Sequence, residues 1–527
     1  MYKEVVMKQQ NIAFEQGSSK FIFADYNTEL GQVITDALTL LQRFPEIEDM
    51  VFHDQESHGE GKKRDRIRYE EWKKARTAEF PDWQPTETAG SVRPLTLERT
   101  GCPRMPAKMV YVFSILRGYL SSMTATSAVN RMRDSRAVEN YLVHTGQALP
   151  AFRTILDNIN TVSQDTLNYI LDCQLKMTLE EDLDDFNEQT LDSTSVQANS
   201  QWPTDASVIY RLIERSCRLS SKFDVLNLPP LTDKWVLDHW LPQMRKLVFH
   251  INTAGGKAGS KGKRKKYCRQ VLRRAHKSLE RLVPHAKMLK GTLNTLDVPP
   301  RQKRRAEEYV DRVIKDLNSA CRTYEQCEAS VFHNKHTRAR DKVLSLSDET
   351  AAFIKKGDRE PVIGYKVQLA RSAKGFVCAV NVPEGNTADS DECVPLVAQS
   401  IQRTDVTPSG VTADDGYSST ANRKSLTGRG IENVRFCGSK GKNITPQEEW
   451  DSEQHRAARS NRSAVESLMY VLKHGFNFGH AQRRGIDRVR CEVLEKVIAY
   501  NFCRRALVRE RKKRREEQDN LQYYKLD

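Results

Sequence analysis

The order of strand-like and helix-like segments is the feature of this 527-residue chain that most restricts its fold. A run rich in Thr, Ser and Val at 189–198 predicts one strand. The following segment, 205–335, has an almost wholly helical pattern of apolar residues. Strand candidates return only after it, beginning at 342–347. The sequence therefore predicts an α/β fold whose first strand is separated from the others by a large helical insertion.

The second half of the chain carries the clearest alternation of strands and helices. Two apolar runs at 362–370 and 376–383 flank Ser-Ala-Lys-Gly at 372–375, which is typical of a β-hairpin. The elements expected after it are a helix at 390–403, a strand at 410–413, a helix, a strand at 434–436 and a helix around Glu466. Upstream, Met109, Val112, Phe113 and Leu116 form one apolar helical stripe. A helical region is therefore expected before the first strand.

Three carboxylates lie on elements of this order that can bring them together as a metal site. Asp192 lies in the first predicted strand, Asp414 follows the strand at 410–413, and Glu466 lies on a predicted helix. Carboxylates that converge from two strands and a helix can hold two divalent metal ions, which activate a water and stabilise a leaving oxygen on a phosphodiester. The chain has 69 acidic residues, so the residues around these three must supply the specificity.

The predicted helix around Glu466 has one apolar stripe, formed by Val465, Leu468, Met469 and Leu472. Arg462, Glu466 and Lys473 project on a line beside that stripe, since their spacings of four and eleven residues return to one face of a helix. The three charges are therefore expected to point into one edge of a cleft. The alternative is that Arg462 and Glu466 form an ordinary exposed ion pair, which contributes a few tenths of a kcal/mol.

Each strand aspartate also has an alternative interpretation. Asp414 begins an Asp-Asp-Gly-Tyr sequence that is also an ordinary strand ending, and Asp415 is a possible alternative ligand. The alternative for Asp192 is that it only caps a turn. Asp205 is expected to cap the helix that begins near Val208. Ser418 or Ser419 is expected to cap the helix that follows Tyr417.

The spacing of Arg462, Glu466 and Lys473 resembles the Tyr-Arg-Glu-Lys signature of a large group of bacterial insertion-sequence transposases. The chain departs from that signature at Arg459, which stands where the family has tyrosine. The sequence Asp414-Asp415-Gly416-Tyr417 is similar to the family's Asp-x-Gly-Tyr. The sequence Asp192-Ser193-Thr194-Ser195-Val196, followed by Pro203-Thr204-Asp205, is similar to the family's Asp-x-Thr-x-Val and its Pro-Thr-Asp turn. The stretches 361–367 and 384–389 also resemble this group.

The resemblance implies a DDE transposase with an RNase H-like catalytic core. Asp192, Asp414 and Glu466 would be the catalytic residues and would hold two Mg²⁺ ions, for which Mn²⁺ can substitute. Arg462 and Lys473 would contact phosphates beside the scissile bond. Such an enzyme binds the terminal inverted repeats of a mobile element in double-stranded DNA, cleaves the DNA and transfers the strand to target DNA. It would act as a dimer or larger assembly on DNA. The alternative is an inactive, transposase-derived regulator that only binds DNA.

Combined with the periodicity, the resemblance predicts a chain divided into several regions. They are a polar N-terminal region at 1–90, a helical DNA-binding region at 91–187, a split RNase H-like core at 188–204 and 336–485, the helical insertion at 205–335, and a C-terminal helix with a basic tail at 486–527.

The net charge of +15 and pI of about 9.2 favour a polyanionic partner. Ten of the 21 residues from Lys257 to Lys277 are Lys or Arg, and none is acidic. A Gly-rich loop at 255–262 precedes Lys263, Arg264, Lys265 and Lys266, which are therefore predicted to bind DNA. Eight of the twelve residues at 504–515 are also basic, and this run is either a second DNA contact or a solvated tail.

The remaining composition favours a cytoplasmic, nucleoid-associated protein. No apolar run reaches the length of a membrane span, and the first residues lack the apolar core of a signal peptide. The eleven cysteines are scattered without a Cys-x-x-Cys pair, which indicates reduced thiols and neither a disulfide framework nor a zinc site.

Overall fold

The computed structural model describes residues 29–57, 105–199, 204–220, 235–253, 260–295, 299–335, 348, 350–355 and 361–523. The strand expected at 342–347 and most of the Gly-rich loop, residues 254–259, lie outside the described residues. The chain divides into two compact units. The first contains residues 1–196, 366–383 and 387–527, and the second contains residues 197–365 and 384–386.

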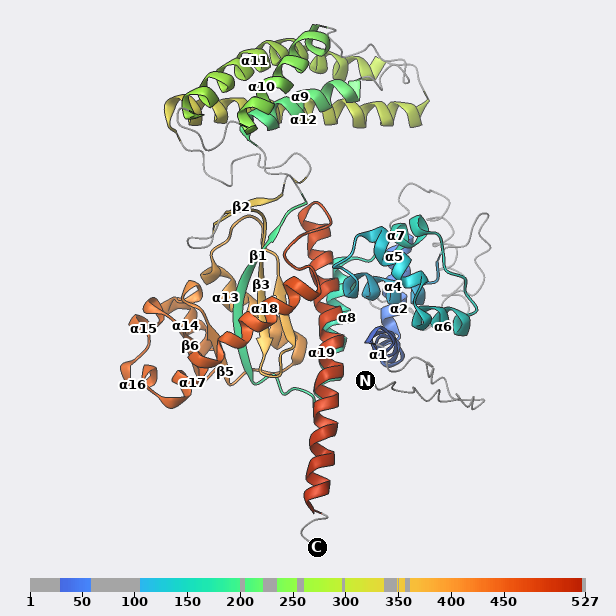
Figure 1. Ribbon diagram of the computed structural model, residues 1–527, viewed down its shortest axis with the longest axis vertical. Helices are drawn as coiled ribbons and strands as arrows, with labels where there is room; N and C mark the ends of the chain where they lie inside the picture. Colours follow the sequence, from blue (N-terminus) through green and yellow to red (C-terminus); the bar gives the residue numbers. More distant parts are fainter. Residues whose placement is uncertain are drawn as a thin grey trace, which may run out of the picture. The chain divides into compact units, whose positions relative to one another are not determined.

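A mixed sheet of six strands is the centre of the α/β part of the chain (Figure 1). Its strands are β1 (Glu188–Gln197), β2 (Ala352–Ile354), β3 (Val362–Ser372), β4 (Val377–Asn381), β5 (Gly410–Ala413) and β6 (Asn433–Phe436). The strand order is β2-β3-β1-β5-β6, and β4 pairs with β3. The pairs β1–β5 and β5–β6 are parallel, whereas β2 and β4 run antiparallel to β3. All four residues of β5 are buried, as expected for a short parallel strand in the middle of a sheet.

The elements from β3 onward confirm the predicted order. The β3–β4 hairpin is followed by α13 (Asp389–Thr404), β5, α14 (Thr420–Thr427) and β6. The Ser419 side chain accepts a hydrogen bond from the Asn422 backbone N–H, so Ser419 caps α14. Three short helices then precede the segment around Glu466: α15 (Ser439–Ile444), α16 (Gln447–Trp450) and α17 (Glu453–Asn461).

The helical segment around Glu466 contains the whole apolar stripe but is not continuous through Arg462. It is divided into α17 and α18 (Ser463–Gly475), and the break lies at Arg462. The Val465 N–H donates to the Arg462 carbonyl at 3.0 Å, which is the tighter three-residue spacing. Arg462 therefore lies at the junction of two helices and not within one continuous helix.

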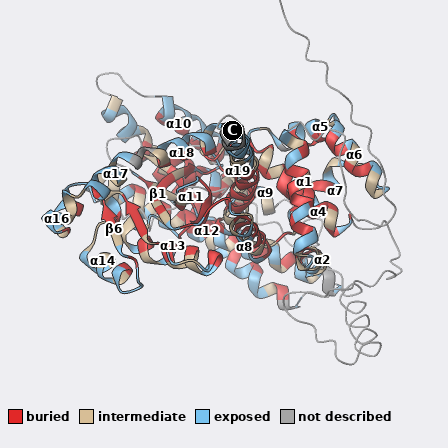
Figure 2. Ribbon diagram, turned by 90° about the horizontal axis from the view of Figure 1, so that it is seen from below, coloured by how far each residue is buried: buried red, intermediate tan, exposed pale blue. Residues whose placement is uncertain are grey.

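The N-terminal part of the first unit is helical, as expected for 91–187, and the region predicted only as polar at 1–90 also contributes two helices, α1 (Glu29–Arg43) and α2 (Glu46–Ser57). The other helices of this part are α4 (Ala107–Tyr119), α5 (Ala125–Arg133), α6 (Arg136–Thr145), α7 (Phe152–Ile159) and α8 (Gln164–Glu180). Helices α1, α4 and α8 pack against the long C-terminal helix α19 (Ile486–Tyr523). Figure 2 shows the buried residues along α4 and α19. At Gly118 a Cβ would lie 2.2 Å from the Glu495 carbonyl oxygen, so glycine permits this close helix contact.

The basic run at 504–515 is part of α19, and its first half is packed whereas Arg511 and 513–515 are exposed on the helix. Arg505 is buried and pairs with Glu181, and Arg509 pairs with Asp36 at 3.1 Å. The run therefore helps to attach α19 to α1 and to the end of α8. Among the described residues, no helix is long and apolar enough to cross a membrane.

The second unit contains a helical bundle at 205–335, in agreement with the predicted insertion. Its elements are α9 (Asp205–Ser220), the π-helical turn η2 (Val236–Trp240), α10 (Leu241–Thr253), α11 (Ser260–Thr292), the short η3 (Leu293–Thr295) and α12 (Pro300–His333). Their apolar stripes meet in one core, in which Ile213, Val271, Val313 and Leu317 are buried. The predicted cap at Asp205 is wrong by one residue. Thr204 Oγ1 accepts from the Ser207 N–H at 3.3 Å, and Asp205 is the first residue of α9.

Candidate acidic site at the end of β5 and the middle of β1

Asp192 and Asp414 lie side by side on neighbouring strands. The parallel register pairs Glu188 with Gly410 and continues to Leu191 with Ala413, so the next step aligns Asp192 with Asp414. Asp414 keeps extended backbone angles after the last residue of β5. Because side chains alternate along a strand, both carboxylates leave the same face of the sheet. Both are partly exposed.

Local hydrogen bonds orient the two carboxylates. Asp414 Oδ1 accepts from the Gly416 N–H at 2.8 Å and so caps the 3-10 turn η5 (Asp415–Tyr417). Asp192 Oδ1 accepts from the Ser193 N–H at 2.7 Å. Each aspartate thus uses one oxygen locally, but only Asp414 caps a turn as its alternative anticipated, because Asp192 lies within β1.

Asp415 has a different environment and is the weaker candidate for a ligand. Its Oδ1 accepts from the backbone N–H groups of Lys440 at 2.9 Å and Gly441 at 3.0 Å, in the first turn of α15. Its Oδ2 lies 3.3 Å from the Ser439 hydroxyl. Both oxygens of Asp415 are therefore used to hold α15 against the turn after β5.

Glu466 is not brought to the two aspartates in this conformation. Its side chain is 69% exposed, and its Oε1 lies 3.5 Å from Arg462 Nη2. This contact is the exposed ion pair that the sequence allowed as an alternative. Within the described residues no group of three or more His, Cys, Asp or Glu side chains is close enough to hold a metal ion. The structure therefore assembles two of the three predicted carboxylates.

The other charged residues of the Glu466 segment have separate positions. Lys473 lies in the last turn of α18 and is partly exposed. The Arg459 guanidinium, at the position where tyrosine was expected, stacks on the Trp450 ring at 4.1 Å. It also donates to the Trp450 carbonyl at 3.2 Å. Arg459 therefore fastens α17 to α16.

A further carboxylate, Asp389, lies close to the turn that carries Asp414, and the sequence analysis predicted no role for it. It begins α13, and its Oδ1 accepts from Lys366 Nζ at 2.9 Å and from Gln368 Nε2 at 2.7 Å. Lys366 and Gln368 are buried polar residues at alternate positions of the apolar strand β3. Two polar residues sharing one face of a buried strand are the signal that predicts such a network.

The Tyr417 hydroxyl lies close to three carboxylates of this site. The ring of Tyr417 is fully buried, and its hydroxyl donates to Gln368 Oε1. Burial raises the pKa of Tyr417, and the negative charges of Asp389, Asp192 and Asp414 raise it further. The phenol is therefore neutral at ordinary pH and acts as a hydrogen-bond donor.

The carboxylates of this site fit a hard divalent cation. Asp192 and Asp414 supply oxygen ligands, which Mg²⁺ and Mn²⁺ prefer. Glu466 would have to approach the pair to complete a three-carboxylate site.

A polar cavity of about 620 Å³ lies farther along the same face of the sheet. Its walls include Glu188 and Thr190 of β1 and Thr412 of β5, and α17 and α18 contribute small side chains. Arg435 is almost fully buried there and pairs with Glu188 at 2.9 Å. The sheet face that carries Asp192 and Asp414 is therefore not tightly covered by the helix that carries Glu466.

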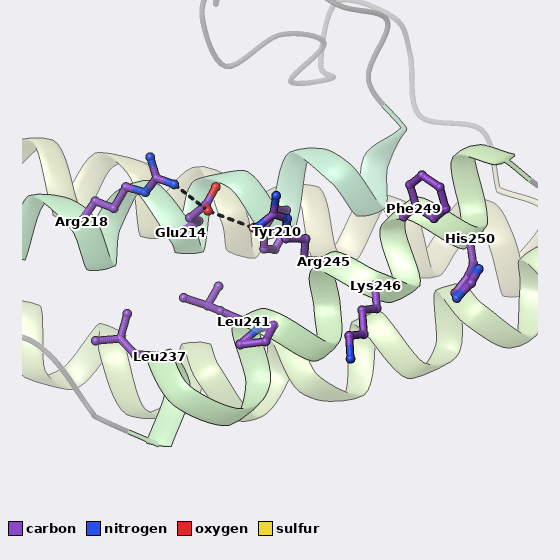
Figure 3. A pocket seen from close by; sticks show the side chains of 10 residues that line it. Tyr210, Glu214, Arg218, Leu237, Leu241, Arg245, Lys246, Phe249 and His250 are labelled. Atoms are coloured by element: carbon purple, nitrogen blue, oxygen red, sulfur yellow. Dashed lines mark hydrogen bonds and ion pairs between the residues drawn. The ribbon is translucent and has the colours of Figure 1, made fainter.

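The helical bundle has its own cavity of about 600 Å³ between α9, η2 and α10 (Figure 3). Leu237, Leu241 and Pro242 give it an apolar lining, and Phe249 at its edge is 64% exposed. Glu214 accepts from Tyr210 at 2.9 Å and from Arg218 at 3.0 Å.

The four predicted DNA-binding residues of the insertion lie on a helix. Lys263, Arg264, Lys265 and Lys266 are exposed in the first two turns of α11, which begins at Ser260, within the Gly-rich loop that was predicted at 255–262. Lys265 Nζ lies 5.5 Å from the centre of the Phe332 ring of α12. The first turn of α11 has no acidic residue, so the helix dipole and the side chains together concentrate positive charge there.

Comparison with known proteins gives one match. Residues 335–502 match the family model described as the transposase DDE domain. No curated protein matches the chain. No solved structure matches it either.

Proposed function

The chain carries a transposase DDE domain of the insertion-sequence type, and from this premise we propose that it binds the ends of a mobile DNA element and catalyses metal-dependent strand cleavage and strand transfer. The observation that carries the proposal is the register of β1 and β5, which aligns Asp192 with Asp414. The order hairpin, helix, strand, helix, strand, helix supports an RNase H-like core.

In the proposed mechanism, Asp192 and Asp414 hold the divalent cations that the family uses, and Glu466 completes their coordination. Such ions, when bound, supply an activated water and stabilisation of the leaving 3′ oxygen. Glu466 lies on α18, only four residues after the break at Arg462. We propose that α18 moves toward the sheet when DNA binds, because the polar cavity beneath α17 and α18 leaves room for that approach.

Arg462 and Lys473 have a positioning function in this proposal. When Glu466 turns to the strand aspartates, its ion pair with Arg462 is exchanged for a DNA phosphate on that guanidinium. Lys473 stands on the same helix and provides a second cation for the backbone near the scissile bond. Cations beside the reacting phosphate offset the charge that develops on it.

The helical bundle supplies a DNA contact through the basic face of α11. Lys263, Arg264, Lys265 and Lys266 add four cations to a helix N-terminus that is itself positive. Their mutual repulsion is unfavourable in the free protein, and phosphates relieve it. The proposed ligand of this face is the backbone of the element end.

Neutralising Lys263, Arg264, Lys265 and Lys266 together to Gln is expected to weaken DNA binding and to flatten its salt dependence. Each lost phosphate contact lowers the slope of log affinity against log salt by about one, so the slope should fall by about three to four units. Fluorescence anisotropy with an element-end duplex at several salt concentrations measures it.

The matched control for this prediction neutralises four basic residues of α19, namely Arg511, Lys513, Arg514 and Arg515. The change in net charge is the same, and these side chains are also exposed. An equal flattening in both variants would mean that only net charge matters. An unchanged slope in the α11 variant would show that this face is turned away from DNA.

The function itself is tested with the full chain and two DNA fragments that cover the sequences on either side of this reading frame. We expect strand cleavage and joining with Mg²⁺ or Mn²⁺, and none with a chelator. Binding of the ends without any cleavage would favour the alternative of an inactive DNA-binding regulator.

We also propose that two or more protomers pair the two ends, since an element has two ends to cut and join.

A further inference from the structure

A buried polar network joins three elements close to Asp192 and Asp414. Lys366 and Gln368 on β3 both donate to Oδ1 of Asp389, at the beginning of α13. Lys366 Nζ also donates to the Thr387 carbonyl at 2.9 Å. The side chains of Lys366 and Asp389 are only 11% and 13% exposed, so solvent competes little with this ion pair.

The same network reaches the turn that carries Asp414. Gln368 Oε1 accepts from the Tyr417 hydroxyl, and Tyr417 ends the turn that Asp414 begins. A Cβ on Gly416 would lie 3.0 Å from Oδ2 of Asp389 and 3.0 Å from Oδ1 of Asp414. The two carboxylates therefore flank one glycine, and that turn can shift little without disturbing Asp389.

The network also reaches the strand that carries Asp192. The Ser193 side chain hydrogen-bonds the Asp389 carboxylate. Ser193 is the buried neighbour of Asp192 on β1 and points to the opposite face of the sheet. Asp389 is thus bonded to the residue next to one candidate ligand and packed against the turn of the other.

The charge of Asp389 is balanced inside the network. Burial alone would raise its pKa, but hydrogen bonds from Lys366, Gln368 and Ser193 and the charge of Lys366 outweigh burial, so its pKa lies below the ordinary 3.8. Asp389 is therefore ionised at neutral pH and paired with a buried ammonium. The Lys366–Asp389 pair adds no net charge beside Asp192 and Asp414.

We propose that Asp389, held by Lys366, is a positioning residue that fixes the spacing of Asp192 and Asp414 and thereby sets their affinity for divalent cations. This inference rests on the proposed function only in assigning those cations a catalytic role. Partners that orient metal ligands typically change metal affinity by about 10–100-fold when they are lost.

The test uses the full chain without DNA, with Mn²⁺ alone as the probe and electron paramagnetic resonance to count free ion. Asp389→Asn is expected to weaken Mn²⁺ binding by about tenfold or more, because Asn cannot accept all the hydrogen bonds that Asp389 accepts. Asp391→Asn is the matched control. It removes the same charge from the same first turn of α13, but at an exposed position outside the network, and should leave the affinity unchanged.

Tyr417→Phe is the second variant, and it tests the proposal even if Asp389→Asn does not fold. It removes one hydroxyl from the network and keeps the buried ring, so the Mn²⁺ affinity should fall several-fold while thermal stability stays near that of the wild type. In the cleavage assay, both variants should need more metal for half-maximal rate and should recover at saturating metal. A merely structural defect would lower the rate at every metal concentration.

Two outcomes would overturn the inference. One is a folded Asp389→Asn protein that binds Mn²⁺ as tightly as Asp391→Asn. The other, if Asp389→Asn does not fold, is a folded Tyr417→Phe protein with unchanged affinity. A third result separates the two proposals. If the wild type binds Mn²⁺ and both variants bind it more weakly, but neither the wild type nor the variants cleave DNA, the positioning role stands and the proposed function fails.

Discussion

Alanine at Asp414 is expected to reduce metal-dependent DNA cleavage by about a thousandfold or more. A metal site contributes several kcal/mol of transition-state stabilisation, and each 1.4 kcal/mol corresponds to about tenfold in rate. Removing Asp414 leaves Asp192, in the middle of β1, without the carboxylate that follows β5 on the neighbouring strand. Asp192→Ala should have the same effect for the same reason. Denaturing gels of a labelled element-end duplex with Mg²⁺ measure the rate.

The matched control is Asp415→Ala, which removes an adjacent carboxylate of equal charge. Asp415 accepts hydrogen bonds from the first turn of α15, so its loss should cost about 1 kcal/mol of stability and little activity. Binding of the element end by Asp414→Ala should stay near that of the wild type. If Asp415→Ala is inactive and Asp414→Ala cleaves normally, the ligand assignment at this turn is reversed.

Glu466→Ala is expected to abolish cleavage as well, although Glu466 is exposed in the free protein. Its contribution depends on α18 approaching the sheet in the DNA complex. The variant should therefore bind Mn²⁺ in the absence of DNA as the wild type does, whereas Asp414→Ala should not. This difference separates a ligand that is in place before DNA binds from one that arrives with DNA.

The sequence predicts the strands and helices around this site well because their patterns are local. The hairpin at 362–383 has alternating apolar runs on either side of a Gly-containing turn, and β5 is a short apolar run that ends in Asp-Asp-Gly. Both signals come from neighbouring residues. The parallel alignment of Asp192 with Asp414 joins residues 222 positions apart, and order along the chain only suggests it.

The sequence does not predict the parts of the site that depend on long-range packing. The apolar stripe correctly predicts α18, whose buried residues are Val465, Leu468, Met469 and Leu472. The stripe does not predict the break at Arg462. Asp389 was part of a family-like stretch, yet its role follows from two buried polar side chains on β3. Those partners are identifiable only when the strand and α13 are placed together.

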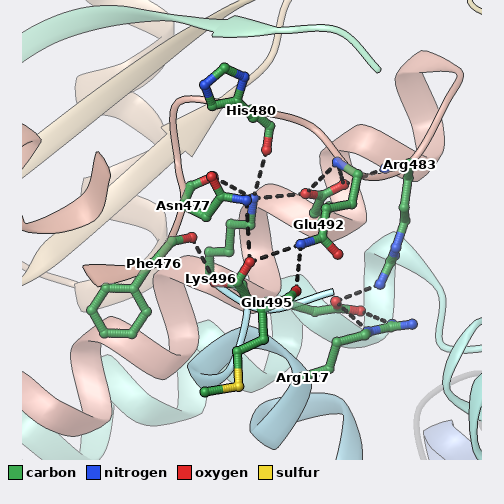
Figure 4. A network of polar contacts seen from close by, with 11 residues as sticks. Arg117, Phe476, Asn477, His480, Arg483, Glu492, Glu495 and Lys496 are labelled. Atoms are coloured by element: carbon green, nitrogen blue, oxygen red, sulfur yellow. Dashed lines mark hydrogen bonds and ion pairs between the residues drawn. The ribbon is translucent and has the colours of Figure 1, made fainter. Parts of the chain in front are cut away.

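Replacing Glu495 with alanine is expected to destabilise the first unit by about 3–5 kcal/mol. Glu495 of α19 is 2% exposed and binds two guanidiniums, Arg483 and Arg117 of α4 (Figure 4). Arg117 also donates to Asn160 at 2.7 Å. Without Glu495 both guanidiniums are left without their carboxylate in a buried place, which costs more than the loss of an exposed pair. Urea denaturation monitored by circular dichroism measures the free energy of unfolding. Hydrogen exchange of the α4 backbone amides shows whether the loss is at the α4–α19 contact.

The exposed pair Glu510–Arg514 on the same helix provides the control. Its side chains are 55% and 71% exposed, so Glu510→Ala should change stability by no more than about 1 kcal/mol. If Glu495→Ala and Glu510→Ala unfold at the same urea concentration, the buried network contributes no more than an exposed pair.

The effect of Glu495 should also depend on pH in a defined direction. Burial alone would raise its pKa, but Arg117 and Arg483 outweigh burial and hold the pKa below its ordinary value of 4.5. A carboxylate with a lowered folded-state pKa contributes stability that is complete above its unfolded pKa and is lost as pH falls through the folded value. The gap in stability between wild type and Glu495→Ala should therefore be constant near neutral pH and narrow below about pH 4.5. A gap that widens as the pH falls would mean that the buried carboxyl stabilises the α4–α19 contact in its protonated form, contrary to the ion pairs in Figure 4.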